Sequence, residues 1–307
     1  MHILITGGSG LIGTALTEQL TAKKHTVSIL SRNPEWVVGL PAGATPVKWD
    51  GRTTEGWGDL VNSVDAIINL AAENLAGESL LSLRWTAKRK ERILRSRQNA
   101  GKAIVEAVRT AKKKPNVVIQ ASAVGFYGPR ADEQITEEAS AGSDYPANVC
   151  KQWEASTKPV EELGVRRVVV RTGIVLSPKG GALPLQLLPF KFFVGGPLGS
   201  GKQYYSWIHI NDAVGGITYL IENEAAAGTF NLTAPNPVTN RELASAIGSV
   251  LSRPDFVPVP GFVFKLAFGE ASTILLEGQR VLPKRLLESG YKFQFSDVRT
   301  ALTDLLK

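Results

Sequence analysis

The chain has 307 residues, of which 43% are hydrophobic and 21% charged. This length fits one large or two modest domains, and this composition excludes a disordered, collagen-like or disulfide-stapled chain. Thirty-five lysines and arginines against 28 acidic residues give a net charge of +7, which favours an anionic partner: a phosphorylated small molecule, nucleic acid or a membrane surface. The single cysteine, Cys150, excludes an intrachain disulfide and is typical of a reducing compartment. Because the sequence shows no secretory signal and no apolar run of about 20 residues, we expect a cytoplasmic protein without a membrane partner.

Short runs of β-branched residues alternate with helical periodicities along the first 175 residues. The patterns predict strands at residues 2–6, 26–30, 66–70, 117–121 and 168–172, and helices at 11–20, 83–111 and 149–163. The strands are apolar at consecutive positions, as in sheets that are covered on both faces. The sequence therefore predicts an α/β fold, a Rossmann-type doubly wound parallel sheet, over residues 1–175.

The second half of the chain predicts a smaller C-terminal α/β substrate lobe over residues 176–307, with a C-terminal module at 254–307. Residues 206–232 are expected to return to the first domain, with a strand beside its sheet and Asp212 as a helix N-cap. The apolar segment 183–194 is interpreted either as a helix packed under the lobe or as a wall or lid of a substrate pocket.

A glycine-rich turn joins the first predicted strand to the first predicted helix. Its glycines are Gly7, Gly10 and Gly13, with Leu11 and Ile12 opening the helix. A tight turn, a close approach of backbone to a pyrophosphate and close helix–strand packing each require a missing side chain. The helix N-terminus then presents amide groups and a positive dipole end to the phosphates. This context favours a dinucleotide site over an ordinary strand-to-helix turn.

The residues that follow the second predicted strand select the dinucleotide. An NAD site usually has an acidic residue there, which accepts hydrogen bonds from the ribose 2′-hydroxyl. This chain has Ser31 and Arg32, whose hydroxyl and guanidinium suit a 2′-phosphate. The sequence therefore predicts NADP(H) as the cofactor, the alternative being that Arg32 is an ordinary solvated side chain.

Several motifs resemble those of a known superfamily. The segments at 6–13, 69–72, 120–122 and 207–212 resemble an extended short-chain dehydrogenase/reductase. More narrowly, Ser96-Arg97, Trp153-Glu154 and the segments 72–74, 84–85, 195–201 and 277–283 are similar to an atypical, NAD(P)-dependent epimerase/dehydratase-like branch, the YfcH-type, whose C-terminal domain has no assigned function. The resemblance spans the chain and implies that Asn69, Leu70, Ala71, Arg97 and Val175 also belong to the NADP(H) site.

The superfamily's catalytic residues are incomplete in this chain. The resemblance implies a serine that orients the substrate oxygen, a tyrosine that transfers a proton, and a lysine four residues after it that lowers the tyrosine pKa. Four residues before Lys151 stands Ala147, and Tyr145 is six residues before it. The Tyr–Lys pair is therefore absent, which puts the usual dehydrogenase mechanism in doubt.

Two residues remain as catalytic candidates. Ser122 lies at the end of a predicted core strand, where α/β sheets bind ligands, although backbone groups could equally satisfy its hydroxyl. Tyr127 is the second candidate, as a phenol that could replace the missing tyrosine, although an aromatic packing role is the favoured alternative. His209 has no second histidine or cysteine at ligand spacing, so we expect a structural role for it and no metal site.

The basic segment from Arg84 to Lys102 is the strongest charge feature, and we expect most of its side chains to be solvated. Arg97 is the exception, because the resemblance implies an approach to the cofactor or to an anionic substrate group. Only Trp85 is an aromatic neighbour, so nucleic acid is not a predicted partner. Two functions follow: an oxidoreductase or epimerase acting on a small carbonyl or sugar-like substrate, or a non-catalytic NADP(H)-binding sensor.

Overall fold

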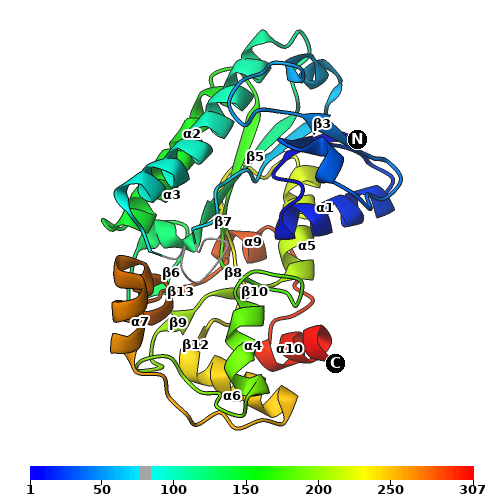
Figure 1. Cartoon of the computed structure of the whole chain (residues 1–307). Helices are drawn as coiled ribbons and strands as arrows, with labels where there is room; N and C mark the ends of the chain where they lie inside the picture. The colour runs from blue at the N-terminus through cyan, green and yellow to red at the C-terminus, as the bar shows by residue number, and fades with distance from the viewer. Residues whose placement is uncertain (76–83) are drawn as a thin grey trace.

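The computed structural model describes residues 1–75 and 84–307 of the chain. Within these residues, seven parallel strands form the main sheet, which runs through the upper half of the molecule in Figure 1. From one edge to the other they are β11 (Gly228–Leu232), β7 (Arg166–Thr172), β5 (Val117–Ala123), β4 (Ala66–Asn69), β1 (His2–Thr6), β2 (Thr26–Ser31) and β3 (Ala44–Lys48). The chain moves outward from β1 to β3, returns to β4 and continues to β11, so the order reverses between β1 and β4. This is the predicted doubly wound Rossmann-type sheet.

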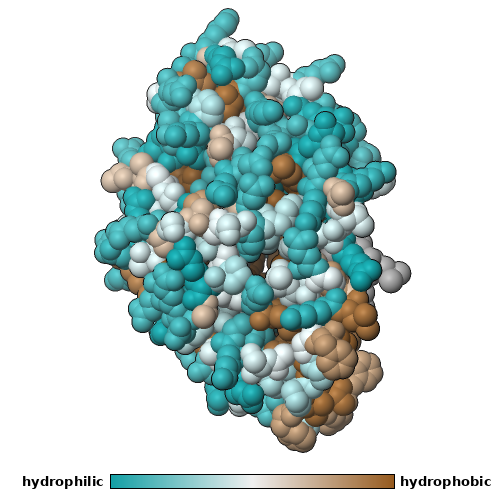
Figure 2. All heavy atoms as spheres, turned by 90° about the vertical axis from the view of Figure 1, so that its left-hand side faces the viewer, coloured by the Kyte–Doolittle hydropathy of each residue, from teal (hydrophilic) through white to brown (hydrophobic). Residues whose placement is uncertain are grey.

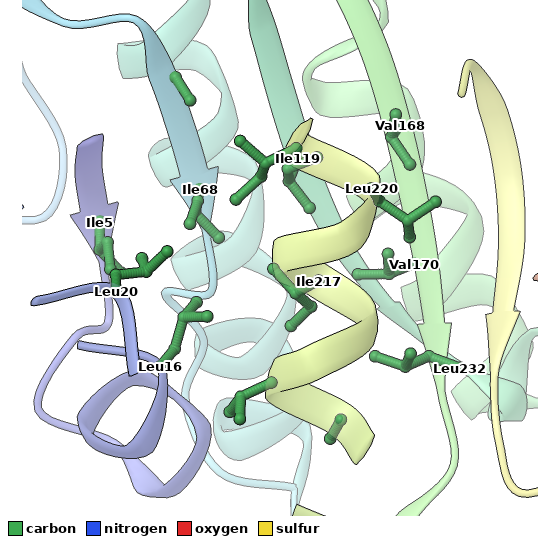
Figure 3. Close-up of a cluster of buried hydrophobic side chains, with 14 of the residues drawn as sticks. Ile5, Leu16, Leu20, Ile68, Ile119, Val168, Val170, Ile217, Leu220 and Leu232 are labelled. Carbon is green, nitrogen blue, oxygen red and sulfur yellow. The ribbon is translucent and has the colours of Figure 1, made fainter. Parts of the chain in front are cut away.

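Helices cover both faces of this sheet because successive side chains of its strands point to opposite sides. Ile3 and Ile5 of β1 face α1 (Leu11–Ala22) and α5 (Ile210–Glu222), whose packing against the sheet is drawn in Figure 3. Leu4 faces the other layer, which contains α2 (Ala87–Thr110). The neighbouring helix α3 (Tyr145–Ser156) packs along α2 and against β5.

The lower half of the molecule in Figure 1 is the smaller lobe. Its elements are β8 (Ile174–Leu176), α4 (Leu183–Lys191), β9 (Tyr204–Tyr205), β10 (Trp207–His209), β12 (Val238–Thr239), α6 (Asn240–Leu251) and α10 (Val298–Leu306). The helices α4, α6 and α10 share one apolar core with Trp207 and Leu176. The strand β10 pairs with β8 and leads directly into α5, which packs on the main sheet, and β11 then pairs with β7 at the edge of that sheet.

The C-terminal segments tie the two halves together. They are α7 (Gly261–Phe268), α8 (Thr273–Leu276), β13 (Arg280–Val281) and α9 (Lys284–Glu288). The strand β13 pairs with β6 (Gln134–Ile135), which follows β5 in the chain. Farther on, the backbone amides of Gln294 and Phe295 donate to the carboxylate of Asp212 at 2.8 and 2.9 Å.

Two local expectations, on α5 and on α3, need correction. Asp212 is not the N-cap of α5: His209 is, with its Nδ1 accepting from the amide of Asn211 at 3.0 Å, while the buried Asp212 binds the C-terminal segment. The helix expected at 149–163 begins earlier, at Tyr145, and α-helical geometry ends at Ser156 because a proline follows at position 159.

The long basic helix begins at Ala87, where Thr86 caps it, and Leu83 lies outside the described residues. The strand β3 was not predicted at all. Its side chains are only half-buried at the sheet edge and Pro46 interrupts its pattern, so the sequence carries a weak strand signal there.

No helix in the described ranges is long and apolar enough to span a membrane. In the same residues, no three acidic, histidine or cysteine side chains come together as a metal site would need.

Candidate functional site

A cleft of about 380 Å³ lies at the carboxyl ends of β1, β4, β5 and β7, beside the point where the strand order reverses. Open α/β sheets bind ligands at this position. Seven predicted cofactor residues line it: Gly7, Gly10, Leu11, Ile12, Gly13, Leu70 and Val175. Ser122 lines it too, together with six residues that the sequence did not single out as site residues: Ala121, Trp153, Thr172, Ile174, Gly181 and Ala182.

The glycine loop forms one wall of the cleft, and its positions require glycine for different physical reasons. Gly7 has φ +72°, a left-handed conformation that other residues adopt with strain. A Cβ on Gly13 would lie 2.4 Å from the carbonyl oxygen of Gly7, so only glycine lets α1 approach the turn. A Cβ on Gly10 would meet only that oxygen, at 3.3 Å, a tight contact that a small shift of the loop could relieve. Internal packing therefore constrains Gly10 less than it constrains Gly13.

The first turn of α1 faces the cleft with its backbone amides available. Gly10 is the N-cap and gives no side-chain cap, and no acidic residue stands in the first turn. The positive end of the helix dipole is therefore not neutralised by the helix itself.

The residues expected to select the nucleotide lie at the end of β2, outside the described lining of the cleft. Ser31 is half-buried, and its Oγ accepts from the amide of Asn33 at 3.2 Å. Arg32 is exposed, and Lys48 at the end of β3 donates from Nζ to its carbonyl oxygen at 2.5 Å. Two cations thus stand at this edge of the sheet, of which sequence reasoning found one. Lys48 was missed because β3 was missed.

Asn69 and Ala71 support the loop from behind. The Oδ1 of the buried Asn69 accepts from Thr6 Oγ1 at 2.7 Å, and its Nδ2 donates to Gln120 at 2.8 Å. The amide of Ala71 donates to Thr6 Oγ1 at 3.1 Å. These bonds fix the ends of β1, β4 and β5 relative to one another, so Asn69 shapes the cleft without lining it.

Ser122 is held by a buried ion pair on the opposite wall. Its hydroxyl donates to Glu154 Oε1 at 2.7 Å, and Arg171 donates to the two oxygens of the same carboxylate at 2.8 and 3.0 Å. Arg171 has 6% of its surface exposed, so both charges are largely withdrawn from water. The hydroxyl proton of Ser122 is therefore engaged, and a ligand in the cleft meets the oxygen's remaining lone pairs. Glu154 and Arg171 were not predicted, although Glu154 belongs to the Trp153-Glu154 motif.

The structure does not bring Tyr127 to the cleft. Its side chain has no exposed surface, and its hydroxyl donates to Asn231 Oδ1 at 2.7 Å and accepts from Arg171 at 3.0 Å. Burial raises the pKa of the phenol despite the neighbouring guanidinium. This burial favours the packing alternative for Tyr127 over a role as a replacement proton donor.

Tyr145 and Cys150 on α3 are also occupied elsewhere. The hydroxyl of Tyr145 donates to the carbonyl of Lys90 at 3.1 Å, away from the described lining of the cleft. Cys150 is buried, and this burial raises the pKa of its thiol to about 11. A thiol with this pKa stays protonated at neutral pH and is a poor nucleophile.

Arg97 is buried rather than solvated. Its Nη1 donates to the carbonyls of Glu73 and Ile93, both at 3.0 Å, and its guanidinium lies 4.7 Å from the ring centroid of Trp153. Burial lowers the pKa of Arg97 to about 10. Ser96 accepts from the amide of Glu73 at 3.1 Å, so the Ser96-Arg97 pair fixes the segment after β4. Arg97 is not among the described residues that line the cleft, but it contacts Trp153, which is. Arg89 of the same helix is also buried, although we expected most basic side chains of this segment other than Arg97 to be solvated.

The described lining of the cleft offers hydroxyls, backbone groups and apolar surface. Ser122 and Thr172 carry its side-chain oxygens, and none of the fourteen residues named above as lining it is ionisable at neutral pH. Such a wall can hold a dinucleotide and an uncharged reacting group. It offers no side-chain proton donor with a pKa near neutrality.

This fold and this site define a short-chain dehydrogenase/reductase of the extended, Rossmann type. A family model described as the NAD dependent epimerase/dehydratase family matches residues 3–233, and a domain of unknown function, DUF1731, matches residues 259–305. The chain therefore belongs to the NAD dependent epimerase/dehydratase family and carries a DUF1731 domain at its C-terminal end.

Relatives of known sequence or structure agree with this assignment. The epimerase family protein YfhF of Bacillus subtilis (strain 168) is 40% identical, covering 100% of this chain and 98% of its own. The crystal structure of human epimerase family protein SDR39U1 (isoform 2) with NADPH is 35% identical, covers 99% of both chains and has a TM-score of 0.87. A nucleoside-diphosphate sugar epimerase from Corynebacterium glutamicum is 32% identical with a TM-score of 0.79, covering 100% of this chain and 58% of its own.

Proposed function

We propose that the cleft binds NADP(H) and that Arg32 contacts the 2′-phosphate. The observation that carries this proposal is the cleft itself. The glycine loop forms one wall of it, where no acidic residue neutralises the N-terminal end of α1. Arg32 follows β2 at the position where an NAD site usually has an acidic residue. The NADPH bound in the human relative supports the same cofactor. Arg97, buried behind Trp153, contributes to the site by holding the segment after β4.

Lys48 strengthens the preference for the phosphorylated dinucleotide. Its ammonium group is fixed at the carbonyl of Arg32, so both cations stand at the carboxyl ends of neighbouring strands. A charge-assisted contact contributes about 1.5–3 kcal/mol, which corresponds to roughly ten- to a hundredfold in affinity.

The binding proposal is tested by calorimetric titration of NADPH and NADH. Wild type is expected to bind NADPH more tightly, and Arg32→Ala to lose about ten- to a hundredfold of NADPH affinity while changing NADH affinity little. Arg95→Ala is the control, since Arg95 is exposed on α2 and pairs with Glu91. Equal affinities of wild type for the two nucleotides would sink the proposal.

The reaction we propose is a hydride transfer between NADP(H) and a small carbonyl or sugar-like substrate, as an oxidoreductase or epimerase. Ser122 would orient the substrate oxygen, because it lines the cleft. Its lone pairs can accept from the hydroxyl of an alcohol substrate, and its proton would turn from Glu154 to the oxygen of a carbonyl substrate. Neither Tyr127 nor Tyr145 would supply the proton, because both hydroxyls are bonded within the protein. The proton would then come from water, and turnover of generic carbonyl compounds should lack the roughly 10²–10⁴-fold contribution of general acid–base catalysis.

Comparison of three variants at matched NADPH occupancy tests this chemistry. With any carbonyl compound that wild type reduces, Ser122→Ala should lower kcat, whereas Tyr127→Phe and Tyr145→Phe should leave it within about threefold, since general acid catalysis is worth at least 10²-fold. A large loss of kcat confined to Tyr145→Phe would overturn the assignment.

A second function, that of a non-catalytic NADP(H)-binding sensor, is favoured by the uncharged lining of the cleft. It would be supported by NADPH binding without NADPH oxidation across a panel of carbonyl compounds and nucleotide sugars.

A further inference from the structure

A second hollow lies at α2, separate from the cleft. Its volume is about 530 Å³, within the range of pockets that hold small molecules. Its walls come from the loop after β3, from the exposed face of α2 and from the end of α3, and none of its described lining residues lines the cleft. Figure 2 faces the layer of α2 and α3, and hydrophilic side chains cover most of the upper half of this view. The lining of the hollow includes Arg52, Thr54, Lys102, Glu106, Arg109 and Ser156.

Three of these side chains are cations and one is an acid, which leaves a net charge of +2. Lys102 and Arg109 stand about two turns apart on the exposed face of α2, with Glu106 between them. Glu106 accepts from Nη1 of Arg109 at 2.7 Å, and within the described residues no other nitrogen of that guanidinium is hydrogen-bonded. The side chains of Arg52, Lys102 and Thr54 have no hydrogen-bond or ion-pair partner in the same part of the chain. We call this hollow the basic pocket.

The loop that carries Arg52 is held in place by its own hydrogen bonds. The Oδ1 of Asp50 accepts from the amides of Arg52 and Thr53 at 2.7 and 2.8 Å. The indoles of the buried Trp49 and Trp57 both donate to the carbonyl of Thr53, at 2.9 and 2.8 Å. Because this backbone is already ordered, a ligand that binds Arg52 does not have to order the loop.

Close packing of two helices forms the opposite wall. A Cβ on Gly101 of α2 would overlap Ser156 Oγ at the end of α3, so only glycine allows this approach. Ser156 and the cations of α2 therefore line the same hollow. Both walls of the basic pocket are thus set by the packing of the protein itself, before any ligand binds.

We propose that the basic pocket binds a small phosphate compound that carries at least two negative charges. The unpaired guanidinium of Arg52 and the unpaired ammonium of Lys102 attract an anion, and Thr54 adds a free hydroxyl donor. These donors come from a loop and from a helix, so they meet from different directions. The oxygens of a phosphate point in several directions and can accept from all of them, whereas a carboxylate offers two oxygens in one plane. The site is distinct from the proposed NADP(H) cleft and does not depend on it.

Calorimetric titration of inorganic pyrophosphate at physiological salt tests the inference. Saturating NADPH is present, because the glycine loop would otherwise take up the probe. Wild type should bind pyrophosphate, and Arg52→Ala/Lys102→Ala should lose at least about tenfold in affinity, since it removes two charge-assisted contacts. The matched control Lys88→Ala/Arg95→Ala removes the same charge from exposed positions of α2 outside the pocket. It should change the affinity by less than about threefold, because salt screens distant charges.

The variant Glu106→Gln should act in the opposite direction. It removes the carboxylate of the basic pocket and releases Arg109 from its ion pair, so pyrophosphate affinity should rise by about two- to fivefold. A site with no anionic ligand gives no such gain. Weaker or unchanged binding by Glu106→Gln would contradict the inference.

Three further results would overturn it. Equal losses in the two double variants would show that net charge alone attracts the probe. Loss of NADPH affinity in Arg52→Ala/Lys102→Ala would assign these cations to the cofactor. Tighter binding of a single-stranded RNA oligonucleotide than of pyrophosphate, abolished by the same variant, would make the pocket part of a nucleic-acid surface. If NADPH itself fails to bind, the proposed function falls, and the comparison of the variants with pyrophosphate still decides this inference.

Discussion

The two walls of the cleft are built by different means. The glycine loop wall is backbone, and its geometry follows from side chains that are missing at Gly7 and Gly13. The opposite wall, at β5 and α3, is side chain: Trp153 and Ser122 face the cleft, and Glu154 holds Ser122 in place. A wall made of backbone depends on the glycines that have no room for a side chain or a left-handed conformation, here Gly13 and Gly7. A wall made of side chains can be rebuilt, and here it lacks the tyrosine and lysine that the superfamily uses.

The largest effects are expected in the glycine loop, where two substitutions separate folding from binding. Gly13→Val should unfold the protein or lower its Tm severely, because its Cβ would lie 2.4 Å from the Gly7 oxygen and 2.6 Å from Gly8 Cα. Gly10→Val should fold and yet lose most NADPH affinity, since its side chain would occupy space beside the proposed pyrophosphate site. Thermal melting by circular dichroism and calorimetry measure the two effects. Normal NADPH binding by Gly10→Val would show that the cofactor lies elsewhere.

The next largest effect concerns the ion pair behind Ser122. Glu154→Gln leaves the buried guanidinium of Arg171 without its carboxylate, and breaking such a pair costs about 3–5 kcal/mol. Urea denaturation should show this loss in the free energy of unfolding. Glu106→Gln, which breaks an exposed pair with Arg109, should change it by less than about 1 kcal/mol. Similar small effects in both variants would mean that the side-chain wall does not depend on its buried charges.

A smaller effect is expected at Tyr127. Tyr127→Phe removes the hydroxyl that joins Arg171 to Asn231, leaving both groups with one partner fewer in a dry environment. The cost should be roughly 1–3 kcal/mol of unfolding free energy, with NADPH affinity unchanged. A loss of NADPH affinity with unchanged stability would contradict the buried structural role given to this residue.

The smallest effect is a pH dependence outside the cleft. Burial lowers the pKa of His209 below 6.5, although Asp304 and Asp212 oppose the shift. The unfolded chain then takes up the proton first, so stability present above about pH 6.5 is lost as the pH falls below it. His209→Asn keeps a side-chain oxygen to cap α5 and removes the titration. The fall in unfolding free energy between pH 7 and pH 5 should become shallower, with a remainder from His25, whose pKa is also lowered. An unchanged slope would exclude His209 as its source.

The sequence by itself determined the features that depend on residues close together along the chain. Alternating apolar runs predicted the doubly wound sheet, and the spacing of Gly7, Gly10 and Gly13 predicted the loop at its edge. The residues before Lys151 excluded the Tyr–Lys pair. These features follow from side-chain periodicity and from local backbone conformation, which a short stretch of chain encodes.

Only the tertiary structure decided which side chains meet. Ser122 and Glu154 are 32 positions apart, and Tyr127 and Asn231 are 104 apart, so no local pattern links them. The same holds for Asp212, which resembles a helix cap in sequence but binds backbone amides more than 80 positions later. Such contacts are fixed by how helices pack on the sheet, because the burial of apolar faces sets the position of α3 and α5 and brings their polar groups along.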